Sequence, residues 1–288
     1  MIFSMTGYAA AHRDLGQAVL SIEIKSVNSR YLDVSFRIGE ELRFLEMVLR
    51  EKITASVGRG KIECRGYLQP QALGVRERTP NAALLAELGR LDTVVRGTLP
   101  QAAPLSVAEV LRWPGVLAEE SLTAEQLQTA ALELFQQLMD EFVASRQREG
   151  AKLADVLRER AGRMREQVAA VTPLVPLAIG AYQDRIATKL RDAVANLDED
   201  RIRQEIGVFA AKIDVAEELA RLTTHLDEVE RVLKKGGAVG KRLDFLMQEL
   251  NREANTLASK SVSVEVTAIA LELKLLIEQM REQVQNLE

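Results

Sequence analysis

Cysteine is almost absent from this chain of 288 residues: Cys64 is the only one, so no disulfide can form within the chain. This scarcity fits a reducing compartment, and we expect a cytoplasmic protein. Aromatic residues are also few, at 4%. The apolar share of 47% still supports a real core. Abundant Ala, Leu, Glu, Arg and Gln favour a mainly helical protein.

Long apolar runs and an excess of one charge are both missing. The best apolar run, Val168 to Ile179, is short and interrupted by Pro173 and Pro176, so we expect no membrane span. The first residues lack the basic start and apolar stretch of a signal peptide. The formal net charge of −4 excludes a globally basic nucleic-acid binder. Any nucleic-acid site must be a local patch or be built by assembly.

Residues 1–75 predict an N-terminal α+β domain. Apolar and polar residues alternate over residues 19–25, 31–38 and 61–68, which is the period of half-buried strands, and residues 2–8 predict a further strand. Apolar residues recur at helical spacing between residues 40 and 57, and Gly58-Arg59-Gly60 ends that helix. The order β-β-β-α-β predicts a sheet with a helix on one side.

Helical patterns fill the rest of the chain. We expect a helical middle region over residues 76–198, including a long helix over 123–171 with Thr123 as its N-cap, weakened locally by Gly150 and Gly162. A C-terminal helical domain, residues 199–288, contains helices over 199–234, 240–260 and 264–287. The predicted fold class is therefore α+β, with a small sheet-plus-helix domain followed by a long, mainly α-helical region.

The helix predicted over residues 240–260 has an unusual polar side. At about 100° per residue, one face carries Asp244, Gln248, Arg252, Asn255 and Ser259, and an apolar stripe lies opposite. Asn and Ser are poorer helix formers than the Glu, Lys and Ala of ordinary exposed helices. The pattern favours a functional surface, and a polar seam between packed helices is the alternative.

The helix predicted over residues 199–234 has a second polar face. It comprises Asp214, Glu217, Glu218, Arg221, His225 and Glu228. A histidine among carboxylates suits metal binding or general acid–base catalysis, or it is simply paired with Glu218 or Glu228. If the two helices are antiparallel, we expect His225 to approach Asp244 and Gln248. Their oxygen donors would suit Mg²⁺ or Mn²⁺.

Glycines and cations suggest where phosphates would bind. The segment from Gly236 to Arg242 is not a nucleotide-binding phosphate loop, because Lys235 replaces a required glycine and Arg242 a required hydroxyl residue. Its cations and backbone amides still suit a nucleic-acid phosphate. Lys25 and Arg37 share the non-core phase of their strands, which suits phosphate contacts or a solvated face equally.

Short motifs extend over the whole chain. They are Ser4 to Tyr8, Ser26 to Asp33, Arg59 to Glu63, Trp113 to Val116, Arg148 to Gly150, Arg203 to Ile206, Glu217 to Leu219, Arg221-Leu222, His225, Gly240 to Leu246, Gln248 to Thr256, Ser259-Lys260 and Arg281 to Asn286. In these motifs the chain resembles the YicC/YloC family of bacterial proteins. Two departures are mild: the family usually has Arg-Lys at Lys241-Arg242 and glycine at Ala258.

The resemblance implies a divalent-metal-dependent endoribonuclease that cleaves RNA phosphodiester bonds in RNA turnover and assembles as a ring-like homo-hexamer. Other RNA-decay proteins are further expected partners. Two alternatives stay open on the same residues. One is a non-catalytic RNA-binding adaptor that presents RNA to another nuclease, and the other is a purely structural helical assembly.

The resemblance also directs the choice of site residues. Those expected near the metal or the scissile phosphate are His225, Asp244, Gln248, Glu249 and Glu253. The expected ligands of a Mn²⁺ or Mg²⁺ ion are His225, Asp244 and Glu218. The residues expected to bind RNA are Arg221, Lys241, Arg242, Arg252, Asn255 and Lys260, with Arg30, Arg59 and Lys61 extending the RNA path.

Overall fold

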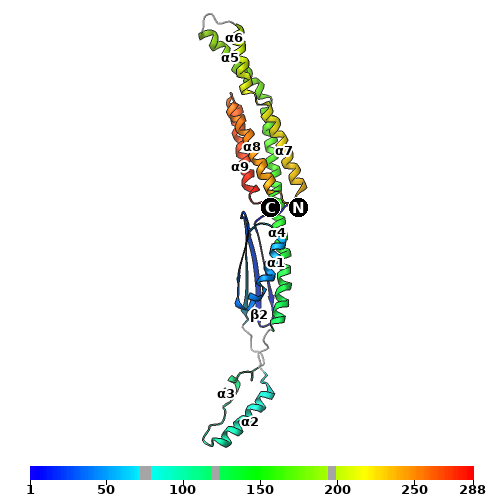
Figure 1. Ribbon diagram of the computed structural model, residues 1–288, viewed down its shortest axis with the longest axis vertical. Helices are drawn as coiled ribbons and strands as arrows, with labels where there is room; N and C mark the ends of the chain where they lie inside the picture. Colours follow the sequence, from blue (N-terminus) through cyan, green and yellow to red (C-terminus); the bar gives the residue numbers. More distant parts are fainter. Residues whose placement is uncertain (72–78, 118–122, 194–198) are drawn as a thin grey trace.

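A four-stranded sheet occupies the middle of an elongated molecule, with long helices extending from one end of it (Figure 1). The computed structural model describes residues 1–71, 79–117, 123–193 and 199–288. The predicted α+β class is confirmed. The predicted domain boundaries after residues 75 and 198 fall on segments outside the described residues. No helix in the described ranges combines the length and apolarity needed to cross a membrane.

The sheet is mixed, with strand order β1-β2-β4-β3. Its strands are β1 (Gly7–Asp14), β2 (Ala18–Val27), β3 (Leu32–Ile38) and β4 (Gly60–Pro70). Pairing is antiparallel except between β3 and β4, which are parallel. The prediction of a strand over residues 2–8 is wrong in position, because residues before Gly7 bind elsewhere: Ser4 pairs with Leu287 in an isolated bridge.

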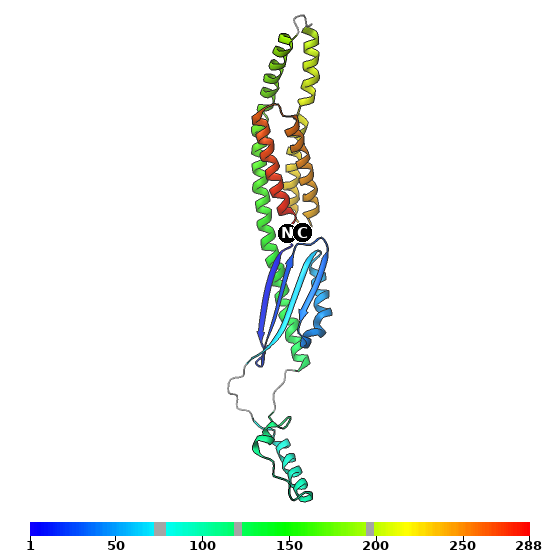
Figure 2. The same cartoon turned by 90° about the vertical axis from the view of Figure 1, so that its left-hand side faces the viewer.

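Helices cover one face of the sheet and leave the other open. The covering elements are η1 (Glu40–Leu45), α1 (Glu46–Ser56) and the first half of α4 (Ala124–Val171), and the core between them and the strands includes Ile22, Ile24, Ile62, Cys64, Leu49, Ile53, Phe135 and Phe142. The predicted helix over residues 40–57 thus begins as a 3₁₀ helix. Figure 2 looks onto the open face, with α4 behind the strands.

The second half of α4 packs with three C-terminal helices, α7 (Ala216–Lys235), α8 (Gly240–Lys260) and α9 (Val264–Val284). Beyond them, α5 (Leu174–Ala193) and α6 (Glu199–Ile213) form a hairpin (Figure 1). A separate small unit contains α2 (Ala82–Thr98) and α3 (Val107–Arg112), which Asn81 and Ser106 cap.

The prediction of one continuous helix over residues 199–234 is wrong. The chain breaks at Asp214–Val215, between α6 and α7. The Asp214 carboxylate accepts a hydrogen bond from the backbone N–H of Ala216 at 2.9 Å, which satisfies a donor at the start of the new helix. Val215 is buried with a non-helical ψ of 11°. A hydrogen bond from the backbone to the Asp214 side chain and the buried Val215 side chain therefore outweigh the helical pattern here.

Both ends of the chain meet at a buried joint between the sheet and the helices (Figure 1). The Arg146 side chain of α4, only 2% exposed, donates from Nε to the carbonyl of Ser4 at 2.7 Å and pairs with the carboxylate of Glu288. Backbone bonds join Met5 to Asn286 at 2.7 Å and Glu288 to Phe3 at 2.9 Å. We call this cluster, residues 1–6, Arg146 and 285–288, the joint.

Two glycines of α4 differ in what surrounds them, and they provide a matched test of the joint. A Cβ on Gly150 would lie 2.3 Å from the carbonyl oxygen of Ile2, whereas a Cβ on Gly162 would meet nothing within 4 Å. We expect Gly150→Ala to lower the free energy of unfolding by about 1–3 kcal/mol through overpacking. We expect Gly162→Ala to raise it by about 0.5–1 kcal/mol through helix propensity.

Chemical denaturation of the two variants beside the unchanged chain gives these differences. If the two substitutions changed the free energy of unfolding equally and with the same sign, the N-terminal residues would not pack against Gly150.

Candidate functional site

Ion pairs fix α7 and α8 as antiparallel neighbours. Lys260 Nζ lies 2.8 Å from Glu218 Oε1, and at the opposite ends of the two helices Arg242 lies 3.1 Å from Glu228. Between these pairs, Arg221 lies 3.4 Å from the buried carboxylate of Glu253. We call this row of interhelical contacts the α7–α8 seam. It sets the register in which the other polar residues of both helices meet.

His225 lies within this seam. On α7 it falls between Arg221 and Glu228, and the register places it opposite Glu249 of α8. His225 and Glu249 are both half-buried. In the part of the chain that the structure describes, neither forms an ion pair with another side chain. An imidazole and a carboxylate are thus placed opposite one another between two ion pairs.

Asp244 and Gln248 lie on the other edge of α8, so the expected approach of His225 to them does not occur within the chain. The Gln248 amide donates to Asp244 Oδ2 at 2.9 Å, and Arg281 of α9 lies 3.9 Å from Asp244 Oδ1. Asp244 follows Arg242 by two residues, about 200° around the helix. When Arg242 faces α7, Asp244 must face away from it.

The three expected metal ligands do not converge within one chain. Glu218 pairs with Lys260, and Asp244 stands 16 residues before Lys260 on α8, about 24 Å along the axis. Across the described ranges there is no group of three or more His, Cys, Asp or Glu side chains that would hold a metal ion. A site made of His225, Asp244 and Glu218 from one chain is therefore not assembled.

Hydrogen bonds and ion pairs within the seam shift the pKa of two of its residues. Hydrogen bonds from Arg231 and then Arg242 lower the pKa of Glu228 to about 2. Glu253 and Glu217 raise the pKa of Arg221. Lys260 also donates to the carbonyl of Asp214 at 2.9 Å, so it bridges α8 to the α6–α7 break. Three of the cations expected to bind RNA, Arg221, Arg242 and Lys260, thus already have carboxylate partners.

The remaining predicted RNA contacts on α8 point outward. Lys241, Arg252 and Asn255 are exposed, and within the described ranges Lys241 and Arg252 form no ion pair. The polar face that the sequence predicts on α8 is therefore an outer surface of the single chain and does not contact α7. The polar contacts between α7 and α8 come from the edge of the apolar stripe, where Arg242, Glu253 and Lys260 lie.

The N-terminal cations lie near the start of α8, at the joint. Asn28 donates to the carbonyl of Gln285 at 2.8 Å, and the backbone N–H of Gly58 donates to Glu288 at 2.9 Å. Arg30, Arg59 and Lys61 follow these two contacts closely in sequence. On the helical side, Gly240 abuts the carbonyl of Leu287, so Lys241 and Arg242 start from the same place.

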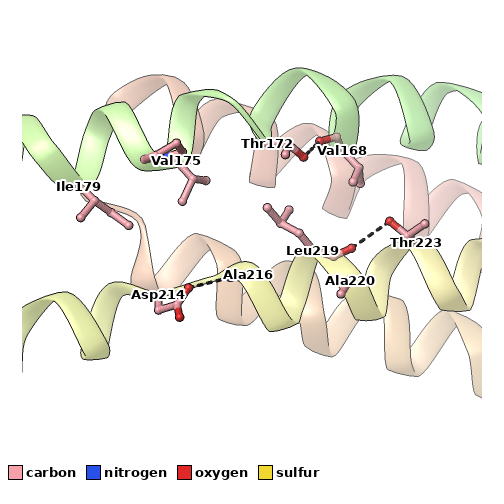
Figure 3. A pocket seen from close by; sticks show the side chains of 10 residues that line it. Val168, Thr172, Val175, Ile179, Asp214, Ala216, Leu219, Ala220 and Thr223 are labelled. Atoms are coloured by element: carbon pink, nitrogen blue, oxygen red, sulfur yellow. Dashed lines mark hydrogen bonds between the residues drawn. The ribbon is translucent and has the colours of Figure 1, made fainter.

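An apolar groove of about 480 Å³ lies between α4, α5 and α7, beside the Glu218–Lys260 end of the seam (Figure 3). It is lined by Val168, Thr172, Val175, Pro176, Ile179, Asp214, Ala216, Leu219, Ala220 and Thr223. None of the site residues expected from the sequence lines it. It marks the point where the two chain breaks, before α5 and before α7, lie side by side.

Sequence reasoning placed Glu228 on the polar face without a role in the site, and it did not single out Arg146. Glu228 holds Arg242 and Arg231, and its spacing of three residues from Arg231 was a readable signal of an ion pair on one helix. Arg146 gave no such signal, because its partners are 142 residues away along the chain on either side.

Comparison with known proteins matches nearly the whole chain. Residues 2–155 match the family model described as "Endoribonuclease YicC-like, N-terminal region", and residues 171–288 match "Endoribonuclease YicC-like, C-terminal". A protein of Haemophilus influenzae named "Probable endoribonuclease YicC" is 42% identical, with both chains covered completely. A protein of Clostridioides difficile with the same name is 26% identical, again over the full length of both chains.

The low pKa of Glu228 predicts how the contribution of the seam to stability depends on pH. Because the folded pKa of about 2 lies below the ordinary value of 4.5, the stabilising contribution is complete above pH 4.5 and is lost as the pH falls through 2. We expect Glu228→Gln to be less stable than the unchanged chain at neutral pH. The difference in stability between the two proteins should narrow as the pH falls below 4.5.

Thermal unfolding of Glu228→Gln and of the unchanged chain, from neutral pH down to the lowest pH at which both fold, measures this difference in stability. Arg242→Gln is the matched variant, since its loss should raise the pKa of Glu228 in an NMR titration. A gap that is constant with pH would show that Glu228 is not engaged in the seam.

Proposed function

Since this chain belongs to the YicC-like endoribonuclease family, we propose that it cleaves RNA at internal phosphodiester bonds. Two full-length relatives are named as probable endoribonucleases. The observation that carries the proposal is the α7–α8 seam. There His225 lies opposite Glu249, between the Arg221–Glu253 and Arg242–Glu228 pairs.

The seam offers the groups that phosphodiester cleavage requires. An imidazole moves protons near neutral pH, and His225 has that role in our proposal, with Glu249 orienting it or sharing the proton. Arg221 and Arg242 exchange their carboxylate partners for phosphate oxygens, with which guanidinium groups form strong paired hydrogen bonds. In that position they stabilise the charge that develops on the phosphate during cleavage.

We further propose that cleavage uses Mn²⁺ or Mg²⁺. Such an ion keeps several waters and often binds through one or two protein groups together with substrate phosphates. His225 and Glu249 are a donor pair of that size, and neither is held by an ion pair in the described part of the chain. Bound there with RNA, the ion would supply Lewis-acid stabilisation of the phosphate and an activated water.

RNA would reach the seam from the joint. In this proposal Arg30, Arg59 and Lys61 bind the strand where it leaves the sheet, and Lys241 binds it at the first turn of α8. Arg252 and Asn255 contact it along the outer face of α8. The support is that Asn28 and Gly58, close in sequence to the three N-terminal cations, bond to Gln285 and Glu288, and that Gly240 at the start of α8 abuts Leu287.

Assembly and location stay predictions from the family resemblance: a homo-hexamer in the cytoplasm, working with other RNA-decay proteins. One feature favours self-association. The outer side of α9 carries Val264, Leu271 and Leu275, each more than half exposed, at the spacing of a helix-packing stripe.

A second candidate is an adaptor that binds RNA without cutting it. The observation that favours it is the state of the seam, where Glu218, Glu228 and Glu253 are each neutralised by a cation. Such a surface exchanges ion pairs for phosphate contacts without needing a metal. The adaptor and the nuclease differ in one outcome, which is whether the RNA is cut.

Replacing His225 tests the nuclease directly. We expect His225→Ala to lower the rate of RNA cleavage by about 100-fold or more, the usual range for loss of an acid–base group, while the variant stays folded. Thr224→Ala is the matched control, because Thr224 is exposed and bonds only to the carbonyl of Ala220 on its own helix. A cleavage time course on single-stranded and hairpin RNA gives the rates.

Chelation separates the remaining possibilities. Cleavage that stops with EDTA and returns with Mn²⁺ or Mg²⁺ supports the metal proposal. Cleavage that continues in EDTA yet needs His225 leaves the nuclease standing and removes the metal. Binding without any cleavage, in all metal concentrations, identifies the adaptor. Wild-type rates in His225→Ala would show that the seam is not the reacting site.

A further inference from the structure

Exposed tyrosines gather on the open face of the sheet. The chain has four tyrosines, and three of them, Tyr8, Tyr31 and Tyr67, are 56%, 70% and 50% exposed. Tyr8 and Tyr67 point outward because they alternate with the buried residues of β1 and β4. Tyr31, just before β3, shares the phase of the outward residues of that strand. For a chain so poor in aromatic residues, this concentration on one face requires a reason.

Cations surround these rings. Lys25, Arg37 and Arg65 all converge on Glu63, at distances of 2.8, 2.9 and 2.9 Å. They hold the pKa of Glu63 at about 2, chiefly through the hydrogen bonds from Lys25 and Arg65. The Tyr8 hydroxyl donates to Glu23 at 3.3 Å, which ties the ring to the same network. Arg30 lies 5.4 Å from the centre of the Tyr31 ring.

The charge of this face is opposite to that of the whole chain. Over the half of the face nearest the joint, six cations, namely Lys25, Arg30, Arg37, Arg59, Lys61 and Arg65, are accompanied by three acids, Glu23, Asp33 and Glu63. The chain as a whole carries a formal charge of −4. A local excess of positive charge against an acidic background attracts a polyanion to this face.

We propose that the open face of the sheet binds single-stranded RNA, with Tyr8, Tyr31 and Tyr67 stacking on unpaired bases and the surrounding cations holding the phosphates. Only unpaired bases expose a ring face to an aromatic side chain, so the preference is for single strands. Recognition by stacking does not depend on which base is present, and the face therefore reads strand character rather than sequence.

The register gives each ring its own base. Tyr8 lies on β1 at the level of Lys25, and Tyr67 lies two strands away on β4 at the level of Ser21. The separation is about 10 Å across the strands and about 13 Å along them. Two rings that far apart cannot stack on the same base, so they stack on different nucleotides of one strand.

This inference rests on the proposed RNA-cleaving function and adds a substrate class to it. The face ends at Arg30, Arg59 and Lys61, close in sequence to the contacts that Asn28 and Gly58 make with residues 285–288, and Gly240 at the start of α8 abuts Leu287. A single strand held on the sheet thus continues toward Lys241 and Arg242. A second copy of the chain is a poorer occupant of this face, because its centre carries the charged cluster of Lys25, Arg65 and Glu63.

Substituting the rings tests the platform separately from the seam. We expect Tyr8→Ala and Tyr67→Ala each to weaken the binding of a short, labelled, unstructured RNA by about fivefold or more, and the double variant by on the order of 25-fold. Binding is measured by fluorescence anisotropy in EDTA, and the length of the RNA is checked on a gel after each measurement. Phe44→Ala is the control, since Phe44 is 48% exposed on η1, away from the open face.

The outcomes decide between explanations. Weaker single-strand binding, with unchanged duplex binding and an unchanged cleavage rate at saturating RNA, supports the platform. Tyrosine variants that bind and cleave like the unchanged chain overturn it while the nuclease stands. An unchanged chain that neither binds nor cuts RNA overturns the proposed function as well. Variants that change the sedimentation of the protein without RNA assign the face to contacts between copies and overturn the platform.

Discussion

The buried guanidinium of Arg146 is the contact on which the arrangement of the molecule depends. A charged group with 2% exposure is tolerated only with partners, and its partners are the Ser4 carbonyl and the Glu288 carboxylate. One side chain of α4 thereby ties together the first residues and the last residues of the chain. This cluster joins the sheet to the C-terminal helices at the point where α4 passes from one core to the other.

The joint lies between two charged surfaces, one on the sheet and one on the C-terminal helices. On its sheet side lie the tyrosines and cations of the open face, and on its helical side α8 begins with Lys241 and Arg242. The α7–α8 seam continues from there, with ion pairs that fix the register of His225. Each part alone would be a modest patch of charge. In the proposed RNA path these parts follow one another along the elongated chain, and their succession depends on the packing around residues 1–6 and 285–288.

Periodicity in the sequence predicted the elements well and their contacts poorly. Alternation located β2, β3 and β4, and helical spacing located α4, α8 and α9. The break at Val215 escaped because the apolar pattern runs through it. The level of His225 against Glu249 escaped for a different reason: both edges of the apolar stripe of α8 are polar. Whether the Glu249 edge or the Asp244 edge meets α7 depends on the position of α9, which local sequence does not encode. The tyrosine pattern, by contrast, was readable from strand phase alone.

The α5–α6 hairpin joins the body through two breaks that lie side by side, at Thr172–Pro173 and Asp214–Val215, around the groove of Figure 3. Both connections lie at the same end of the hairpin, beside the groove. A helix of 20 residues, the length of α5, is about 30 Å long, so a tilt of about 10° at the attached end displaces the far end by about 5 Å. Lys260, which donates to Glu218 and to the Asp214 carbonyl, lies at this attachment, so its two contacts bear directly on the tilt of the hairpin.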